Sequence, residues 1–168
     1  HHPHVTQGLE TRRGRLIAYS RVNFAFFQTP RLHYRRAGFF LSLEVQSGRL
    51  ASYGVHPYRI TERGLRALGR EEAREFRTAL RRVSAPFGPV QGVAEAWQAY
   101  LAYYGPEGFK KEVLGILAMM ETEPRKGAAM FRNRVTTLQH AELWRDALTR
   151  LMSEKPSPAR PRWTRIID

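Results

Sequence analysis

The spacing of apolar residues divides the chain into a strand-rich N-terminal part and a helical C-terminal part. Between residues 5 and 60, apolar and β-branched residues occur in short alternating runs separated by turn residues, a period of two that is typical of strands. This pattern predicts two hairpins, with strands at 5–10 and 15–20 around Arg12-Arg13-Gly14 and strands at 38–45 and 50–53 around Ser47-Gly48. Residues 55–60 are expected to extend the second sheet, with Pro57 favouring its edge.

After residue 70 the apolar residues recur at steps of three and four, beginning with Ala73, Phe76, Leu80 and Val83. This spacing is that of one helical face. The same argument predicts helices at 93–104, 107–120, 124–134 and 138–152. We expect Gly105-Pro106 to end the first of these four helices. Thr136 and Gln139 stand at the spacing of a capping box before the last one.

The predicted elements define an α+β fold with three regions. Residues 1–84 form the strand-rich part with its first helix, residues 90–152 form a helical extension, and the Pro-containing tail at 153–168 is expected to be extended or mobile. The chain has 168 residues, of which 42% are hydrophobic, so it can supply a packed core. Its longest apolar run, residues 113–120, is too short to cross a bilayer, which needs about 20 residues.

The charge balance indicates an anionic partner without identifying it. The formal net charge is +13, which favours nucleic acid, acidic lipid, phosphate esters or a polyanion. The arginines are spread singly and in pairs, whereas a nucleic-acid-binding arm is more often a dense block, so a general abundance of arginine in the source proteome stays an equal alternative. Cysteine is absent, which excludes disulfides and thiolate metal sites and leaves the compartment open.

The opening residues His1-His2-Pro3-His4 are the clearest candidates for chemistry. Two histidines separated by one residue can direct their imidazoles at adjoining metal ions if the backbone is extended. A histidine cluster at a chain end is also typical of a purification-tag remnant or a solvated loop. Spacing alone leaves both interpretations open.

The residues that follow add context to this cluster. They are His2-Pro3-His4-Val5-x-Gln7-Gly8-x-Glu10, then Gly14-Arg15-Leu16-Ile17-Ala18-Tyr19-Ser20, then Asn23-Phe24-x-Phe26. In order and approximate spacing these blocks resemble the closing motif of the poly-γ-glutamate capsule-synthesis (CapA-like) family, a branch of the two-metal phosphoesterases. The chain departs from that motif where Arg21 and Val22 replace the usual Leu-Gly. Without that glycine, the turn must differ or Val22 must be strained.

The resemblance implies a fold, a cofactor and a reaction. The chain would be the C-terminal part of a metallophosphoesterase-like α/β/β/α sandwich of antiparallel hairpins, followed by a helical extension. His2 and His4 would each bind one of two divalent ions of the manganese, iron or zinc type, and metal-bound hydroxide would attack a phosphoryl group. The other ligands are expected upstream of residue 1, inside a longer reading frame, so this fragment alone is expected to be inactive.

Three further residues are candidates for positioning a loop or the substrate: Gln7, Arg21 and Asn23. A buried hydrogen bond to backbone is an equally good interpretation of Asn23, and a solvated surface position is the better one for Arg21. The substrate implied is an anionic small molecule or polyglutamate, acted on within a capsule-synthesis complex. The compartment would be the cell envelope or the cytoplasm.

Two alternative functions stay open. The first is a basic module for nucleic acid, which the lack of a motif with aromatic residues interleaved among basic ones makes unlikely. The second is a non-catalytic helical interaction module at residues 90–152, for which an exposed apolar stripe would be the sign. Because partner strands are missing, we also expect the β portion to expose an apolar face and an unpaired edge.

The remaining candidates for catalysis rank lower. Three histidines lack a partner at ligand spacing, and two serines lack a nucleophile elbow: His33, His56 and His140, and Ser20 and Ser42. The aromatic cluster Trp97, Tyr100, Tyr103 and Tyr104 has helical spacing, which favours core over a stacking platform. Arg132 and Arg134 could reach an anion or pair with Glu142 and Asp146.

Overall fold

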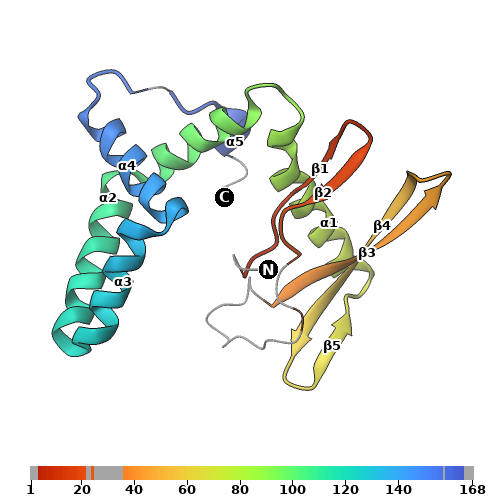
Figure 1. Ribbon diagram of the computed structural model, residues 1–168, viewed down its shortest axis with the longest axis horizontal. Helices are drawn as coiled ribbons and strands as arrows, with labels where there is room; N and C mark the ends of the chain where they lie inside the picture. Colours follow the sequence, from red (N-terminus) through yellow and green to blue (C-terminus); the bar gives the residue numbers. More distant parts are fainter. Residues whose placement is uncertain (1–3, 22–23, 25–35, 157, 165–168) are drawn as a thin grey trace. The chain divides into compact units, whose positions relative to one another are not determined.

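The computed structural model describes residues 4–21, 24, 36–156 and 158–164 (Figure 1). The fold class is α+β, as predicted, with two small antiparallel sheets and helices after them. The chain divides into two compact units, His1–Gly92 and Val93–Asp168. Each unit is described by itself below.

Both predicted hairpins are present in the first unit. Strands β1 (Leu9–Arg12) and β2 (Arg15–Ala18) form the first. Strands β3 (Ala37–Gln46) and β4 (Arg49–Thr61) form the second. In each two-residue turn both residues have positive φ, with Arg13 at 51° and Gly14 at 72° in the first turn. Positive φ at both positions is what a type I′ turn requires, and its twist matches that of the strands.

The second sheet is larger than the pattern predicted. Strand β4 is continuous through residue 61, and a further strand, β5 (Gly64–Ala67), pairs with its end in the order β3-β4-β5. The edge position expected for Pro57 is therefore wrong, because Pro57 lies in the central strand. Its carbonyl accepts a hydrogen bond from the Leu68 N–H on the β5 side at 3.3 Å. Because N and O of one strand residue point to the same side, the missing N–H of Pro57 costs no bond to β3.

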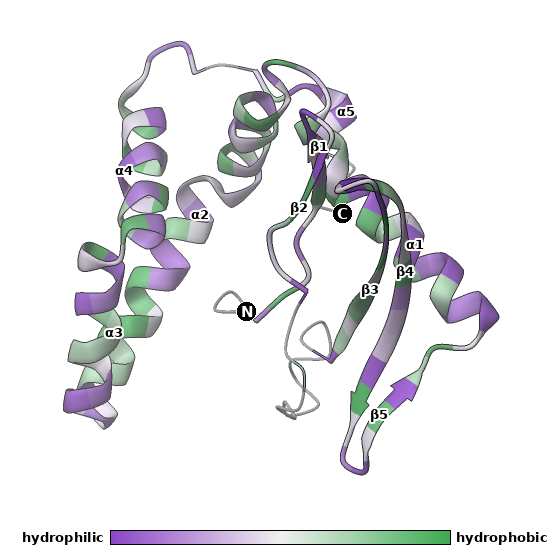
Figure 2. Ribbon diagram, turned by 45° about the vertical axis from the view of Figure 1, so that its right-hand side comes forward, coloured by the Kyte–Doolittle hydropathy of each residue, from purple (hydrophilic) through white to green (hydrophobic). Residues whose placement is uncertain are grey.

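Helix α1 (Arg70–Ser84) confirms the change of period after residue 70. It begins after Gly69, whose N–H donates to the Glu72 carboxylate at 3.1 Å. Ala73 and Leu80 are buried on its inner face, and the Phe76 ring lies 6.1 Å from that of Phe39 on β3. Figure 2 shows hydrophobic and hydrophilic stretches alternating along this helix, as its amphipathic spacing requires.

The second unit is helical. Helix α2 (Gly92–Thr122) is interrupted at Gly105, whose φ of 48° and ψ of −167° are not helical, so the prediction that Gly105-Pro106 ends a helix is confirmed. Helices α3 (Pro124–Thr136) and α4 (Leu138–Met152) follow and pack together. The buried side chains include Leu101 and Ile116 of α2 and Trp144 and Ala147 of α4. Among the described helices, none combines the length and apolar character needed to cross a bilayer.

Two local expectations in the second unit need correction. The capping box at Thr136 and Gln139 is wrong: the residue before α4 is Thr137, and the Thr136 hydroxyl donates to the Arg132 carbonyl at 2.8 Å. The tail is not extended throughout, because Pro161–Thr164 form a helical turn, α5, that buries Trp163. The indole of a tryptophan can be buried while its N–H still donates a hydrogen bond. The proline content of the tail gave no indication that Trp163 is buried in this way.

Candidate functional site

The first two motif blocks form one paired ribbon. Beyond the β1–β2 ladder, the Tyr19 N–H donates to the Gly8 carbonyl at 3.3 Å and the Gln7 N–H donates to the Ser20 carbonyl at 3.0 Å. A further antiparallel bridge joins Thr6 to Arg21. The ribbon therefore runs from the turn at residues 13 and 14 to an open end at residues 4–6 and 21, where the predicted ligand His4 lies.

Close packing explains the motif glycine. A Cβ at Gly8 would lie 2.6 Å from the Phe87 ring and 2.7 Å from the Val83 carbonyl oxygen, which is closer than such atoms approach. On the next residue, the Leu9 N–H donates to the Ser84 hydroxyl at 2.9 Å. Gly8 thus lets the ribbon lie directly on the C-terminal end of α1.

Contacts within the ribbon explain two more motif positions. The Tyr19 hydroxyl donates to the Glu10 carboxylate at 2.5 Å, and this bond raises the pKa of Tyr19. The Tyr19 ring also stacks on Phe87, with centroids 4.8 Å apart. Ser20 is 3% exposed. These motif residues hold the ribbon in place and do not themselves form a reactive cluster.

His4 has an unusual backbone conformation. Its φ is 56°, in the left-handed region that few residues other than glycine adopt, although histidine is enriched there. Such strained positions cluster at functional sites. The side chain is half-buried. His2 and Asn23, the other predicted ligand and one predicted positioning residue, lie outside the described residues, as do Val22 and His33.

The two described positioning candidates occupy different surroundings. Gln7 is half-buried, and its backbone belongs to the ribbon ladder. Arg21 is exposed and lines a cavity of about 270 Å³ with aromatic side chains: Phe24, Phe39, Phe40 and Tyr58. Burial raises the pKa of Tyr58, and the positive charge of Arg21 opposes that rise. The positioning roles of Gln7 and Arg21 stay predictions.

The described residues supply only part of a metal centre. Among them no group of three or more His, Cys, Asp or Glu side chains could hold an ion together. Imidazole is a good ligand for zinc, iron and related ions, so the chemistry of His4 fits the metals that the resemblance implies. A two-metal centre would need donors in addition to those in the described part of the chain.

The structure joins Ser42 to His56, a pair that the sequence did not reveal. The hydroxyl lies 2.8 Å from Nε2 on neighbouring strands, with both residues exposed. In the register set by the turn at residues 47 and 48, Ser42 lies opposite Gly54, so His56, two residues further along β4, is a diagonal neighbour of Ser42. The contact could therefore have been predicted from the turn and the strand register. Among the described residues no carboxylate bonds this imidazole, so the pair lacks the third member of a catalytic triad.

A second polar cluster lies in the helical unit around Glu112. Its carboxylate accepts hydrogen bonds from the Tyr104 hydroxyl at 2.7 Å and the Trp144 indole at 2.9 Å, and it forms an ion pair with Arg134. Of the two alternatives for Arg134, the pairing with Glu142 or Asp146 is therefore wrong, because Arg134 pairs with Glu112. Burial opposes ionisation of Glu112, but the indole, the phenol and Arg134 together lower its pKa.

The aromatic cluster forms a partly exposed ladder. The Trp97 and Tyr100 centroids are 5.7 Å apart and those of Tyr100 and Tyr104 are 6.2 Å apart, with near-parallel rings. Tyr103 is 68% exposed and outside the ladder. The Trp97 indole donates to Asp146 at 2.8 Å. The hydrogen bond of Trp97 joins α2 to α4, and the hydrogen bond of Tyr104 joins two parts of α2. These bonds favour a structural role for both residues.

Comparison with known proteins gives no further identification. A scan against protein-family models produced no match, and searches of curated proteins and of solved structures produced none either. The family resemblance therefore rests on the motif residues themselves.

Proposed function

We propose that this chain is the C-terminal portion of a capsule-synthesis-type, two-metal phosphoesterase-like protein, to which it contributes the ligands His2 and His4. The observation that supports this proposal is that the motif blocks pair as one ribbon, with His4 at its open end in a left-handed conformation. Packing accounts for the ribbon residues Gly8, Glu10 and Ser20. The left-handed conformation of His4 favours a ligand role for it, because strained residues cluster at functional sites.

The proposed residues have distinct tasks. His2 and His4 would each hold one ion through a ring nitrogen, and the ions would lower the pKa of bound water and neutralise phosphoryl oxygens. The ribbon would fix the direction of His4 through its packing on α1. Arg21, exposed at the same end, is placed to attract an anionic substrate from solvent. An anionic small molecule or polyglutamate would be that substrate.

Metal content tests the ligand assignment. In a longer polypeptide that includes the ligands expected upstream, His2→Ala/His4→Ala should lower the bound metal to at most one ion per chain by elemental analysis. His56→Ala is the matched control, because this exposed histidine bonds Ser42 and should leave the metal content unchanged. Equal metal content in the double variant and the wild type would contradict the assignment.

Activity of the present chain gives a second test. Hydrolysis of an aryl phosphate with added manganese should not exceed the background rate, because one or two imidazoles cannot hold a two-metal centre. Metal-dependent turnover that His4→Ala abolishes would show that the chain assembles the site without further ligands.

A helical interaction module is the second candidate function, and one observation favours it. On α4, Leu148, Leu151 and Met152 are 42%, 44% and 84% exposed, and their spacing of three and four places them on one face. Leu148→Glu/Leu151→Glu should reduce any self-association seen by sedimentation, whereas Thr149→Glu, at the exposed position between them, should not. If the wild type is monomeric in this experiment, the α4 surface is not a site of self-association.

A further inference from the structure

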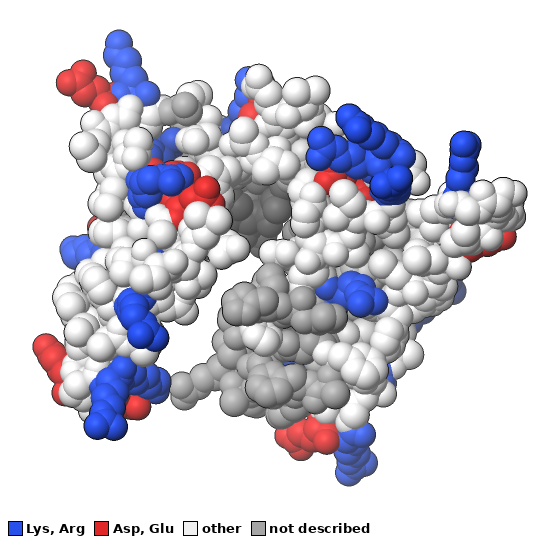
Figure 3. All heavy atoms as spheres, viewed as in Figure 1, with Lys and Arg blue, Asp and Glu red and all other residues white. Residues whose placement is uncertain are grey.

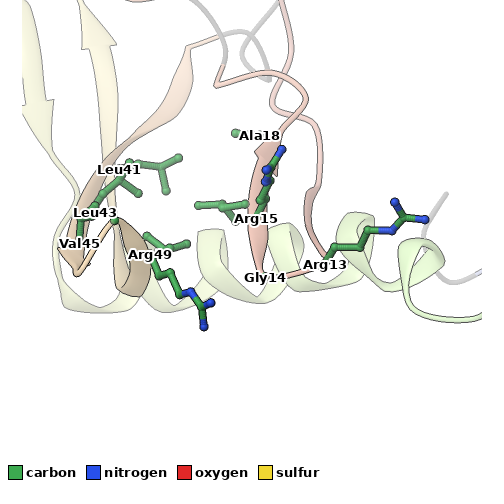
Figure 4. Close-up of a pocket in the computed structure, with 11 residues that line it drawn as sticks. Arg13, Gly14, Arg15, Ala18, Leu41, Leu43, Val45 and Arg49 are labelled. Carbon is green, nitrogen blue, oxygen red and sulfur yellow. The ribbon is translucent and has the colours of Figure 1, made fainter.

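A hollow in the first unit lies between its two hairpins. It has a volume of about 790 Å³ and opens between the β1–β2 ribbon and the β3–β4 hairpin (Figure 4). Leu16 and Ala18 line it from β2, and Leu41, Leu43 and Val45 line it from β3. We call this hollow the hairpin groove. Its volume is in the range of small-molecule sites.

Strand alternation gives the groove its apolar walls. Leu41, Leu43 and Val45 are alternate residues of β3 and so belong to one face, although the register shifts after Glu44. Leu16 and Ala18 are alternate residues of β2. Leu43 is 57% exposed and Val45 is 61% exposed. Burying such aliphatic side chains is favourable, so the walls favour an occupant with an apolar body.

The charges of the groove have one sign. Its lining includes Arg13, Arg15 and Arg49 and no acidic residue, and apart from these arginines every lining residue is aliphatic or glycine. None of the three forms an ion pair with another described residue. In Figure 4 the Arg13 and Arg49 side chains extend away from the apolar walls toward the outside. The Arg13 guanidinium points to the far side of the ribbon, so a ligand with an anionic end can meet the Arg49 guanidinium at the mouth.

We propose that the hairpin groove binds an amphiphile that has a single alkyl chain and a phosphate or carboxylate head. The chain lies against the leucines and Val45, and the head lies at the mouth beside Arg49. A peptide fits the groove less well, because its backbone amides need hydrogen-bond partners that aliphatic walls do not offer. This inference does not depend on the proposed metal site.

Calorimetric titration of the full chain with dodecyl phosphate, below its micelle concentration, tests the proposal. Saturable binding is expected. Dodecyl maltoside, which has the same chain and no charge, should bind at least tenfold more weakly, and inorganic phosphate should show no binding. Octyl phosphate should also bind at least tenfold more weakly, because each buried methylene contributes up to roughly a fourfold gain in affinity.

Two variants locate the ligand. Leu43→Glu puts a negative charge on an exposed position of the apolar wall and should weaken binding of dodecyl phosphate at least tenfold. Leu65→Glu is its control, because Leu65 is an exposed apolar strand residue of β5 outside the lining. Arg49→Ala should weaken binding about threefold to tenfold and reduce the preference over dodecyl maltoside. Its charge-matched control is Arg63→Ala.

Three results would overturn the proposal. The first is an affinity for dodecyl maltoside equal to that for dodecyl phosphate. The second is unchanged binding of dodecyl phosphate to the Leu43→Glu variant when the amide spectrum of that variant shows a folded sheet. The third is sedimentation showing a dimer that Leu43→Glu dissociates and dodecyl phosphate does not, since a second copy of the chain would then cover the groove.

Discussion

The two compact units hold their carboxylates in different ways. In the first unit Glu72 lies at the surface, 36% exposed, where Arg59 and Arg66 donate to it. In the helical unit Glu95 and Glu112 are 15% and 22% exposed. Each of these two accepts an indole N–H and pairs with arginine: Trp163 with Glu95, and Trp144 with Glu112. The helical unit therefore uses partly buried carboxylates to join elements distant in sequence.

The two units are held together by different kinds of contact. Strand pairing and the contact of Gly8 with α1 fix the first unit. Both units leave large apolar side chains exposed, among them Leu43 at 57% and Leu138 at 68%, and in the helical unit hydrogen bonds to partly buried charged groups add specificity to the packing. Basic side chains lie in small separate groups on the face shown in Figure 3, and several pair with acidic ones.

The tryptophans allow the two units to be measured separately. All three, Trp97, Trp144 and Trp163, lie in the helical unit. Tryptophan fluorescence during unfolding therefore reports on the helical unit, whereas amide resonances of β3 and β4 report on the first. A chain with two units need not unfold in one step, so the two signals are expected to give separate midpoints.

The largest expected effect is on the first unit. Gly8→Ala should destabilise it by about 2 kcal/mol, because the added methyl group would overlap the Phe87 ring and the Val83 carbonyl. Loss of the β3 and β4 amide resonances should occur at lower denaturant, and the fluorescence midpoint should not change. Gly88→Ala is the control, since its new methyl group would lie 3.7 Å from the Ala85 carbonyl oxygen, an ordinary van der Waals distance. An unchanged amide midpoint for Gly8→Ala would contradict the packing argument.

Local patterns predicted much of this fold because local interactions determine those parts. The turns at residues 13–14 and 47–48, the face of α1 and the break at Gly105 each depend on residues close in sequence. Strand β5 was missed because it has only four residues and one large apolar side chain, Leu65, which is too little to indicate a strand. The position of Pro57 depended on this missed strand.

The candidate site was less accessible to sequence reasoning. The motif indicated the ribbon and His4 at its end, but not the packing that explains Gly8, because Phe87 is distant in sequence. Ser42 meets His56 through strand register, and Arg134 meets Glu112 through the folding of α3 against α2. Such pairings depend on tertiary geometry that the periodicity of one segment does not contain. The metal assignment stays a prediction.

An intermediate effect is expected in the helical unit. Glu112→Gln keeps an oxygen acceptor but removes the charge that faces Arg134 and strengthens the bonds from Tyr104 and Trp144. The unit should lose about 1 kcal/mol, seen as a lower fluorescence midpoint. Glu121→Gln, an exposed position on the same helix, should change that midpoint little. Glu72→Gln, in the first unit, should leave the fluorescence midpoint unchanged. If Glu72→Gln lowered this midpoint as much as Glu112→Gln does, the contrast between the units would be contradicted.

The smallest expected effect concerns the surface carboxylate of the first unit. Hydrogen bonds from Arg66 and the Gly69 N–H lower the pKa of Glu72 from 4.5 to about 2. Because the folded-state pKa is below the unfolded value, the stabilisation is complete above about pH 4.5 and is lost as the pH falls toward 2. A carboxyl-carbon NMR titration should show a midpoint near 2, which Arg66→Ala should move toward 4.5. Arg63→Ala, in the adjacent turn, should not move it. A wild-type midpoint near 4.5 would show that solvent screens these contacts, and Glu72 would then add no acid-dependent stability to the first unit.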